Sequence, residues 1–367
     1  MLATTEGVRM LRQLSGLATD GHAVLSLYVD LDASSFPTPA ARDAEVSALL
    51  SHAGVHRADA ERVRELLRAR PQLVRGAYGL AIFSSAGAGV LEAVALPGHV
   101  DPLAVVDTVP WLEPLAATMT SENWGVAVVS RREARLFRGG PRSLVEFATV
   151  DDALHRRHAQ GGWAQARYQR GIEEQVAEHV RHTTERMLRA HRRRPFDHLV
   201  VVASGELWPL VEASLDHDLR DRLAGRVALN IEHAPAEEIA RVVAPVIERA
   251  ERDRERTLVA RLEDALGSGG PAAAGLDNVL AMLEQERVET LLVADGARLT
   301  AGLCSRCGRL AGSGENRCPL DGAALAAVDA VEHAIEMAAH HCSDVVVLHR
   351  ERAALREHDS IAALLRW

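Results

Sequence analysis

The chain has 367 residues, which suggests two or three domains of ordinary size and excludes a small disulfide-stapled scaffold. It is 47% hydrophobic and 25% charged but only 4% aromatic, a globular composition whose cores must rest on Ala, Val and Leu. The formal net charge of −9 excludes a chain that binds polyanions over its whole surface, so any nucleic-acid surface must be local.

No apolar run approaches the roughly 18 residues that a membrane helix needs, and residues 1–16 lack the apolar core of a secretory signal. Three of the four cysteines are packed into residues 304–318, which is more typical of a metal cluster in a reducing compartment than of a disulfide framework. We therefore expect a cytoplasmic protein with no membrane partner.

Residues 1–118 are expected to form an N-terminal α+β domain. The predicted elements are a strand (23–31), a helical stretch rich in Arg and Glu (46–69) and two further strands (76–83 and 90–95). The segment 107–114, which contains Pro110, indicates the exit from this domain.

Residues 119–268 are expected to form a central domain. The predicted elements are strands at 124–130, 134–138 and 143–150, a helix from 172 to 194, a strand at 198–203, a helical stretch at 205–222, a strand at 226–231 and a long helix at 236–266. Pro195 ends the first helix, and Pro245 should kink the last helix or split off its first turns. This alternation of strands and helices predicts an α/β layer fold.

Residues 267–271, Gly-Ser-Gly-Gly-Pro, are typical of a linker, and residues 272–367 should form a second, smaller α/β unit. Its predicted elements are a helix (278–286), a strand (289–294), a cysteine-rich insertion (303–322), a helix (328–341), a strand (344–349) and a tail (361–367).

The most informative stretch is the loop at 161–165, Gly-Gly-Trp-Ala-Gln. Gly161 and Gly162 permit a close approach of the main chain to another molecule. Gln165 cannot act as a base at neutral pH, but its amide can orient a water, and exposed N–H groups can stabilise an oxyanion. The chemistry that fits best is ester hydrolysis without a protein nucleophile. The alternative is an ordinary strand-to-helix connection with Trp163 packed against the domain.

The surroundings of this loop are strongly basic. Residues 155–194 contain ten arginines against four glutamates, a local net charge of +6 in an acidic chain. Such a helix suits docking on a phosphate backbone. Internal pairs such as Glu185 with Arg189 would neutralise part of the charge, but the run Arg192, Arg193 and Arg194 is not neutralised locally.

The loop, the basic helix behind it and the strands around it resemble the central domain of archaeo-eukaryotic class-one peptide release factors. The tripeptide Gly-Gly-Gln of those factors enters the ribosomal peptidyl transferase centre, and this chain is closer to the Gly-x-x-Gln variant of the bacterial members. By this resemblance Gly162 and Gln165 are the first and last motif positions, and Gly161 precedes them. The resemblance implies a mixed-sheet, RNase H-like central domain with Gly161, Gly162 and Gln165 as catalytic residues.

The C-terminal unit supports the same resemblance. Residues 275–284 and 288–293 are similar to the opening helix and strand of the last domain of release factors and Pelota, and residues 361–367 are similar to its final strand. The resemblance covers residues 120–367 and implies a C-terminal α/β/α, ribosomal-protein-like domain. The N-terminal segment lacks the Asn-Ile-Lys-Ser and Tyr-x-Cys motifs of factors that read stop codons, so stop-codon decoding is not expected.

The cysteine-rich insertion has the spacing of two zinc knuckles. Cys304 and Cys307 precede Gly308, and Cys318 is followed three residues later by Asp321, where a fourth cysteine would be expected. These four residues predict a structural zinc-ribbon-like site. A loop without metal and a site completed by Cys342 are the alternatives, and Cys342 itself is expected in the core.

Together these features imply a ribosome-associated peptidyl-tRNA hydrolase of the release-factor type, acting as a codon-independent rescue factor. Arg167, Arg170, Arg192, Arg193 and Arg194 would hold phosphates of tRNA or rRNA. The expected partners are the ribosome, its RNA, and a protein that contacts the C-terminal domain. Two alternatives stay open: a non-catalytic ribosome-binding hibernation or protection factor, and a factor that cleaves the tRNA acceptor end.

Overall fold

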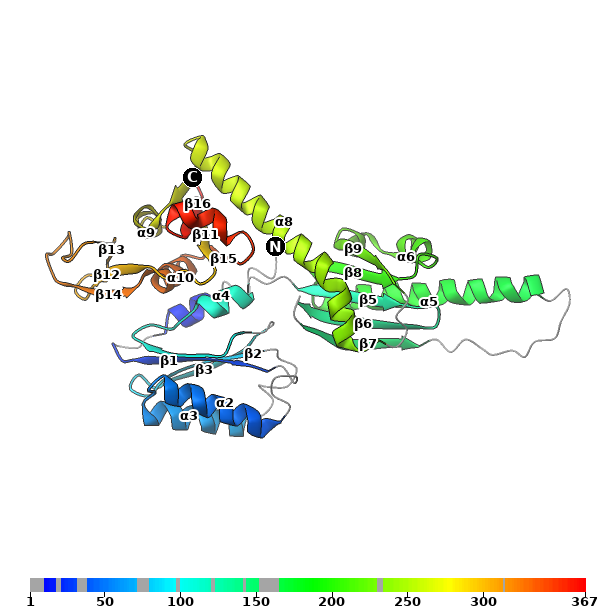
Figure 1. The fold of residues 1–367 in the computed structure, drawn as a ribbon, viewed down its shortest axis with the longest axis horizontal. Coiled ribbons are helices and arrows are strands. Elements are labelled where there is room, and N and C mark those ends of the chain that lie inside the picture. Colours follow the sequence, from blue (N-terminus) through cyan, green and yellow to red (C-terminus); the bar gives the residue numbers. More distant parts are fainter. Residues whose placement is uncertain are drawn as a thin grey trace. The chain divides into compact units, whose positions relative to one another are not determined.

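The computed structural model describes residues 10–17, 21–31, 38–70, 79–96, 100–119, 123–140, 143–151, 165–229, 234–312 and 314–367. The chain divides into two compact units, Met1–Ser121 with Arg252–Trp367 and Glu122–Glu251. Figure 1 shows the helices and strands of both units and labels most of them. The fold is mixed α/β with several sheets, as the strand and helix pattern predicts. The division into three domains at 118/119 and 268–272 stays a prediction.

The N-terminal part of the first unit is an antiparallel sheet of order β3-β2-β1-β4 covered by two helices on one face (Figure 1). Its elements are β1 (Val24–Asp30), α2 (Pro39–His52), α3 (Arg57–Ala69), β2 (Gly79–Ser85), β3 (Val90–Leu96) and β4 (Leu103–Asp107). Leu25 and Leu27 of β1 pack with Leu50 and Val63 of the helices. Tyr28 belongs to the core on the other face of the sheet.

The C-terminal part of the same unit has a sheet of order β10-β16-β11-β15, in which β11 and β15 run parallel. Its elements are β10 (Ala272–Ala274), α9 (Leu276–Glu284), β11 (Val288–Ala294), α10 (Ala330–His340), β15 (Asp344–Leu348), the 3-10 helix η2 (Arg352–His358) and β16 (Ile361–Leu365). A smaller sheet, β13-β12-β14, stands between β11 and α10 in sequence and consists of β12 (Thr300–Cys304), β13 (Leu310–Ala311) and β14 (Leu325–Asp329). The central strands β16 and β11 and the edge strand β15 are almost wholly buried, as continuous apolar runs predict.

The unit Glu122–Glu251 is built on a mixed sheet of order β7-β6-β5-β8-β9, antiparallel from β7 to β5 and parallel from β5 to β9. Its elements are β5 (Trp124–Val129), β6 (Glu133–Gly140), β7 (Ser143–Asp151), α5 (Gln165–Arg193), β8 (His198–Ala203), α6 (Trp208–Ser214), α7 (His217–Arg220), β9 (Leu223–Ala228) and the first part of α8 (Ala236–Gly267). Val176 and Val180 of α5 pack on one face of the sheet, and Ile239 and Val243 of α8 pack on the other.

Among the residues that the structure describes, no helix is long and apolar enough to span a membrane.

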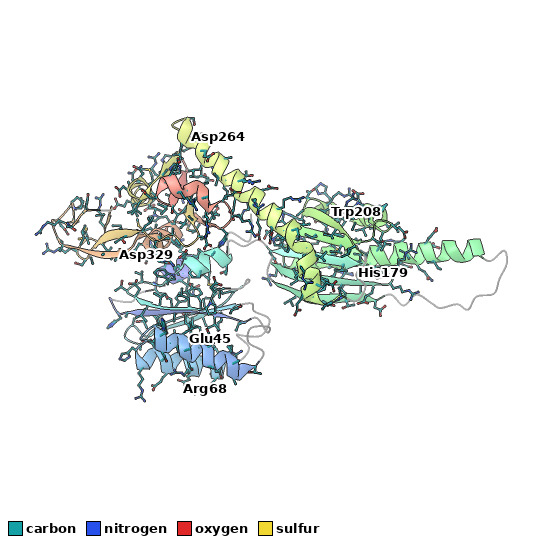
Figure 2. All side chains as sticks on the ribbon, in the orientation of Figure 1. Glu45, Arg68, His179, Trp208, Asp264 and Asp329 are labelled. Atoms are coloured by element: carbon teal, nitrogen blue, oxygen red, sulfur yellow. The ribbon has the colours of Figure 1, made fainter. Side chains whose placement is uncertain are left out.

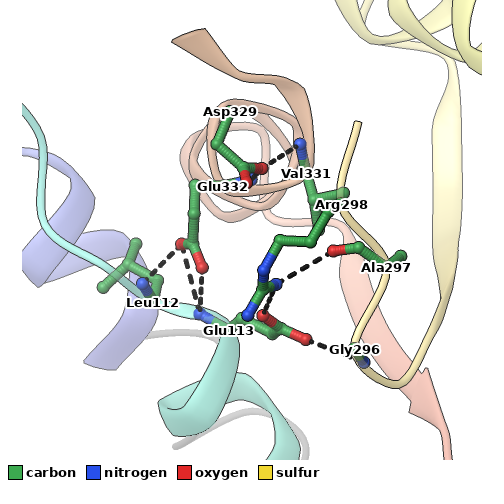
Figure 3. A network of polar contacts seen from close by, with 8 residues as sticks. All are labelled: Leu112, Glu113, Gly296, Ala297, Arg298, Asp329, Val331 and Glu332. Atoms are coloured by element: carbon green, nitrogen blue, oxygen red, sulfur yellow. Dashed lines mark hydrogen bonds and ion pairs between the residues drawn. The ribbon is translucent and has the colours of Figure 1, made fainter. Parts of the chain in front are cut away.

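A buried carboxylate joins the N-terminal and C-terminal parts of the first unit at α4 (Glu113–Met119), as Figure 3 shows. Glu332 of α10 accepts hydrogen bonds from the backbone N–H groups of Leu112 at 2.6 Å and Glu113 at 3.1 Å. The Glu113 side chain accepts a 2.8 Å hydrogen bond from Arg298. Because both N–H groups lie at the start of α4, Glu332 caps this helix from a distant segment of the chain.

Burial raises the pKa of Glu332 to about 8, although the two backbone donors oppose this shift and Glu113 and Asp329 reinforce it. A carboxyl group that binds its proton more tightly when folded loses its contribution to stability as pH rises through the folded pKa. The free energy of unfolding should therefore fall between pH 4.5, near the ordinary value, and pH 8. Denaturant unfolding across this range measures the slope.

Glu332→Ala should destabilise the unit by about 2 to 5 kcal/mol, because it leaves two buried N–H groups without an acceptor. Glu332→Gln should flatten the pH dependence. Glu263→Gln, an exposed position on α8, is the control and should change stability by less than about 0.5 kcal/mol. An unchanged pH slope in Glu332→Gln would contradict the assignment of this titration.

Candidate functional site

The basic helix predicted behind the glycine and glutamine loop is α5. Its apolar residues recur on one side and are buried against the sheet, together with His179, which Figure 2 labels. Gln165 is the first residue of α5, and Arg167 and Arg170 follow in its first turns. Gly161 and Gly162 lie outside the described residues. The helix thus begins at the last position of the Gly-x-x-Gln motif.

The solvent side of α5 is lined by arginines. Arg181, Arg186 and Arg189 are exposed along the helix, and Arg192 and Arg193 are exposed in its last turn. Arg192 lies 3.6 Å from Asp218, an exposed pair of little energetic value. Within the described part of α5, the i,i+4 pair expected between Glu185 and Arg189 does not form an ion pair. Glu173, Glu174, Glu178 and Glu185 are also exposed on this helix, so the positive charge available to a polyanion is concentrated at its carboxyl end, in Arg192, Arg193 and the following Arg194.

The carboxyl end of α5 is held by Arg138 of β6. The Arg138 guanidinium donates hydrogen bonds to the carbonyls of Ala190 at 3.3 Å and Arg194 at 2.8 Å, and the Ala190 carbonyl also accepts the backbone N–H of Arg194 at 3.1 Å. The same guanidinium lies 4.4 Å from the centroid of the Phe196 ring and 5.7 Å from that of Phe147. Cation–π contacts of this kind favour a fixed side-chain position.

His191 completes this group, and we call Arg138, Phe147, His191 and Phe196 the aromatic cluster. The ring centroids of His191 and Phe196 are 5.8 Å apart, and Nδ1 of His191 accepts the backbone N–H of Phe196 at 3.1 Å. Burial and the charge of Arg222 lower the pKa of His191, so its ring is neutral at pH 7. Sequence patterns do not predict this cluster, because its residues come from β6, β7, α5 and the connection between α5 and β8 and share no spacing.

The predicted metal ligands come together in the small sheet. The ligand atoms of Cys304, Cys307, Cys318 and Asp321 all lie within 4.8 Å of one another. Cys342 is not part of this group; it is exposed rather than in the core, and its sulfur accepts a 3.1 Å hydrogen bond from Arg12. The expectation of a core Cys342 is therefore wrong, because the residue follows the end of α10 with a positive φ of 56°.

The two knuckles have the same backbone geometry. Gly308 donates its N–H to the carbonyl of Cys304 at 2.9 Å, and Gly322 does the same to Cys318 at 2.9 Å. Both glycines have positive φ, 73° and 70°, which favours glycine at the close of each turn. Asp321 therefore occupies the place in the second knuckle that Cys307 occupies in the first.

The distances fit a tetrahedral ion. Zinc with bonds of about 2.3 Å to sulfur and 2.0 Å to oxygen separates two sulfurs by about 3.8 Å and a sulfur from an oxygen by about 3.5 Å. The Cys307 and Cys318 sulfurs are 3.6 Å apart, and the Cys304 sulfur is 3.5 Å from an Asp321 oxygen. The backbone N–H of Ala323 lowers the pKa of Asp321, which keeps this ligand ionised. These four residues could hold a metal ion.

Comparison with known proteins identifies the class of the central segment. Residues 110–249 match the family model described as bacterial archaeo-eukaryotic release factor family 10. This range holds the mixed sheet, α5, the aromatic cluster and most of the first part of α8, whereas the four metal-ligand candidates lie outside it. Over residues 110–249 the chain is thus similar to the bacterial archaeo-eukaryotic release factors.

One curated relative and two solved structures extend the comparison. Peptide chain release factor subunit 1 of Archaeoglobus fulgidus is 25% identical over 211 residues, which are 54% of this chain and 51% of that protein. The chain thus spans about half the length of this curated relative. The archaeal translation termination factor aRF1 is 19% identical with a TM-score of 0.27, covering 99% of this chain and 98% of that one. The model of ribosome-bound archaeal Pelota and ABCE1 is 15% identical with a TM-score of 0.45, covering 79% and 77%.

Proposed function

We propose that the protein is a ribosome-associated, codon-independent rescue factor that hydrolyses the ester between a nascent peptide and tRNA. The observation that carries the proposal is that the basic helix α5 begins at Gln165, three residues after Gly162, in a segment that matches the release factor family. The absence of the Asn-Ile-Lys-Ser and Tyr-x-Cys motifs supports codon independence.

In this proposal Gln165 orients the attacking water through its side-chain amide. The amide stays neutral at physiological pH, so it positions the water and does not deprotonate it. Backbone N–H groups between Gly162 and Gln165 would stabilise the oxyanion of the tetrahedral intermediate. Gly161 and Gly162 leave room for the main chain to approach the ester.

The arginines supply the docking surface. Arg167 and Arg170 near the amino end of α5, and Arg192, Arg193 and Arg194 at its carboxyl end, would bind phosphates of tRNA or rRNA. These contacts position the protein on RNA without reading sequence, which suits a factor that works at any codon. The C-terminal part would in addition contact a protein partner.

Zinc is the metal that we propose for Cys304, Cys307, Cys318 and Asp321. Three thiolates and a carboxylate form a closed site of the kind that stabilises a fold. Nothing reactive accompanies the four side chains, so the ion would hold the two knuckles together and take no part in hydrolysis.

A single assay separates this function from its alternatives. Purified protein is added to stalled ribosomes that carry labelled peptidyl-tRNA, and the products are resolved on a gel that distinguishes free peptide, intact peptidyl-tRNA and shortened tRNA. Free peptide with intact tRNA supports the hydrolase. Co-sedimentation with empty ribosomes without peptide release would identify a binding or protection factor, and a shortened tRNA would identify acceptor-end cleavage.

A further inference from the structure

Phe147 of the aromatic cluster is exposed on the edge strand of the central sheet. It lies where Leu136 pairs with Ala148 but Phe137 pairs with Glu146, so Phe147 is the extra residue of a β-bulge. The bulge leaves the ring 40% exposed, although it stands beside the buried Phe196.

The position of the Phe147 ring is fixed by its contacts with Phe196 and Arg138. Phe196 packs on Gly125 of β5 so closely that a Cβ there would lie 2.8 Å from the ring. Arg138 contacts both Phe196 and Phe147, and its hydrogen bonds to the end of α5 fix the guanidinium. The two rings also contact each other, with centroids 6.4 Å apart and planes tilted by 37°, so Arg138, Phe196 and Phe147 form a three-way cluster in which Phe147 is the exposed member.

The charge around the aromatic cluster is positive. Arg192, Arg193 and Arg194 are exposed at the end of α5, next to Arg138. The acidic neighbours are already engaged: Glu146 pairs with Arg135 at 2.6 Å, Asp218 lies by Arg192, and Asp197 accepts the backbone N–H of Asn123. The Arg135 guanidinium also holds the pKa of Glu146 below its usual range. An exposed aromatic ring beside several cations is the pattern that binds single-stranded nucleic acid, with a base on the ring and phosphates on the cations.

We propose that the carboxyl end of α5 is a second RNA site, where an unpaired nucleotide stacks on Phe147 and its flanking phosphates bind Arg193 and Arg194. Gln165 and Arg193 are 28 residues apart on one helix, so this site lies about 40 Å from the catalytic loop. The inference rests on the proposed function in one respect: it assumes that the unit Glu122–Glu251 binds RNA. This second site would bind an unstacked base, whereas the arginines along the rest of α5 would bind only phosphates.

The test is binding of the full chain to a labelled twelve-nucleotide oligouridine, measured by fluorescence anisotropy at low salt. Phe147→Ala and Phe147→Leu should each weaken binding about 5- to 100-fold, because both remove the stacking surface, while Phe147→Trp should retain wild-type affinity. Arg193→Ala should reduce the slope of log affinity against log salt by about 0.7. Thermal unfolding of each variant confirms that the fold is intact.

Leu229→Ala is the matched control, since Leu229 is 41% exposed and follows β9 on the opposite edge of the same sheet. Wild-type affinity in Phe147→Ala, or no binding of oligouridine by the wild-type protein, would overturn the inference. Wild-type affinity in Phe147→Leu together with loss in Phe147→Ala would show an apolar docking surface for a protein segment instead. Peptide release by the wild-type protein is measured separately, so that a failure of the proposed function and a failure of this site are distinguishable.

Discussion

Gln165→Ala is expected to release peptide from stalled ribosomes at least about 100-fold more slowly than the wild-type protein, while its affinity for ribosomes stays within a few-fold. The side-chain amide is assigned to the orientation of water at the ester, and removing one preorganised polar group from such a site costs about two to three orders of magnitude in rate. The phosphate contacts assigned to the arginines are unchanged in this variant. Single-turnover release of labelled peptide measures the rate, and co-sedimentation measures the affinity.

Gln175→Ala is the matched control for this experiment. Gln175 is the same residue type on the same helix, ten residues further along, and its side chain is exposed. It should release peptide at the wild-type rate. Equal release by Gln165→Ala and the wild-type protein would count decisively against the assignment of Gln165, whatever the ribosome affinity of the variant.

Strongly apolar runs allowed the sheets to be predicted closely. The expected strand at 198–203 is β8, and the expected strand at 124–130 is β5, one residue shorter. Both are buried along nearly their whole length, so their sequences carry no polar interruptions. The edge strand β9 lies at 223–228, three residues earlier than predicted, because an alternating strand at a sheet edge gives a weaker signal of its ends.

Helix ends were harder to predict than helix interiors. The apolar repeat of α5 begins near Ile172, whereas the helix begins at Gln165, because its first turns are polar and contain Gly171. The stretch 46–69 was predicted without a break, but α2 ends at His52 and Gly54 has a φ of 63°. Pro245 does not divide α8, which continues through it. The tertiary contacts of the helix outweigh the lost hydrogen bond there.

The metal site and the aromatic cluster show what spacing can reveal. Two local turns supply all four metal ligands, so the pattern of Cys304, Cys307, Cys318 and Asp321 was visible in sequence. The cluster around Phe147 depends on the register of β6 with β7, and a one-residue bulge places the ring. Glu332 accepts a hydrogen bond from the backbone N–H of Leu112, which is 220 residues away in sequence, and no local sequence pattern predicts such a contact.

Zinc binding should require the three thiolates of Cys304, Cys307 and Cys318, and its affinity should change when Asp321 is replaced. The full chain purified with zinc is expected to hold about one ion, and Cys304→Ala is expected to hold about none, because a site with two thiolates and a carboxylate loses one of its four ligands. Asp321→Cys should bind zinc more tightly than the wild-type chain, since it replaces a harder oxygen ligand by a thiolate. Metal analysis of the protein and competition with a chromogenic chelator measure both effects.

Removal of the ion should loosen the small sheet selectively. β13 has only two residues, so β12, β13 and the knuckles have little core of their own, and trypsin should cleave at Arg306 and Arg317 faster once a chelator has removed the metal. Cys342→Ala is the control, because Cys342 lies outside the cluster, and it should retain both the ion and the protease resistance. A full complement of zinc in Cys304→Ala would contradict the assigned ligands. Loss of zinc in Cys342→Ala would instead show that Cys342 is a zinc ligand. Asp321 would then not be needed as the fourth ligand, although its place in the second knuckle matches that of Cys307 in the first.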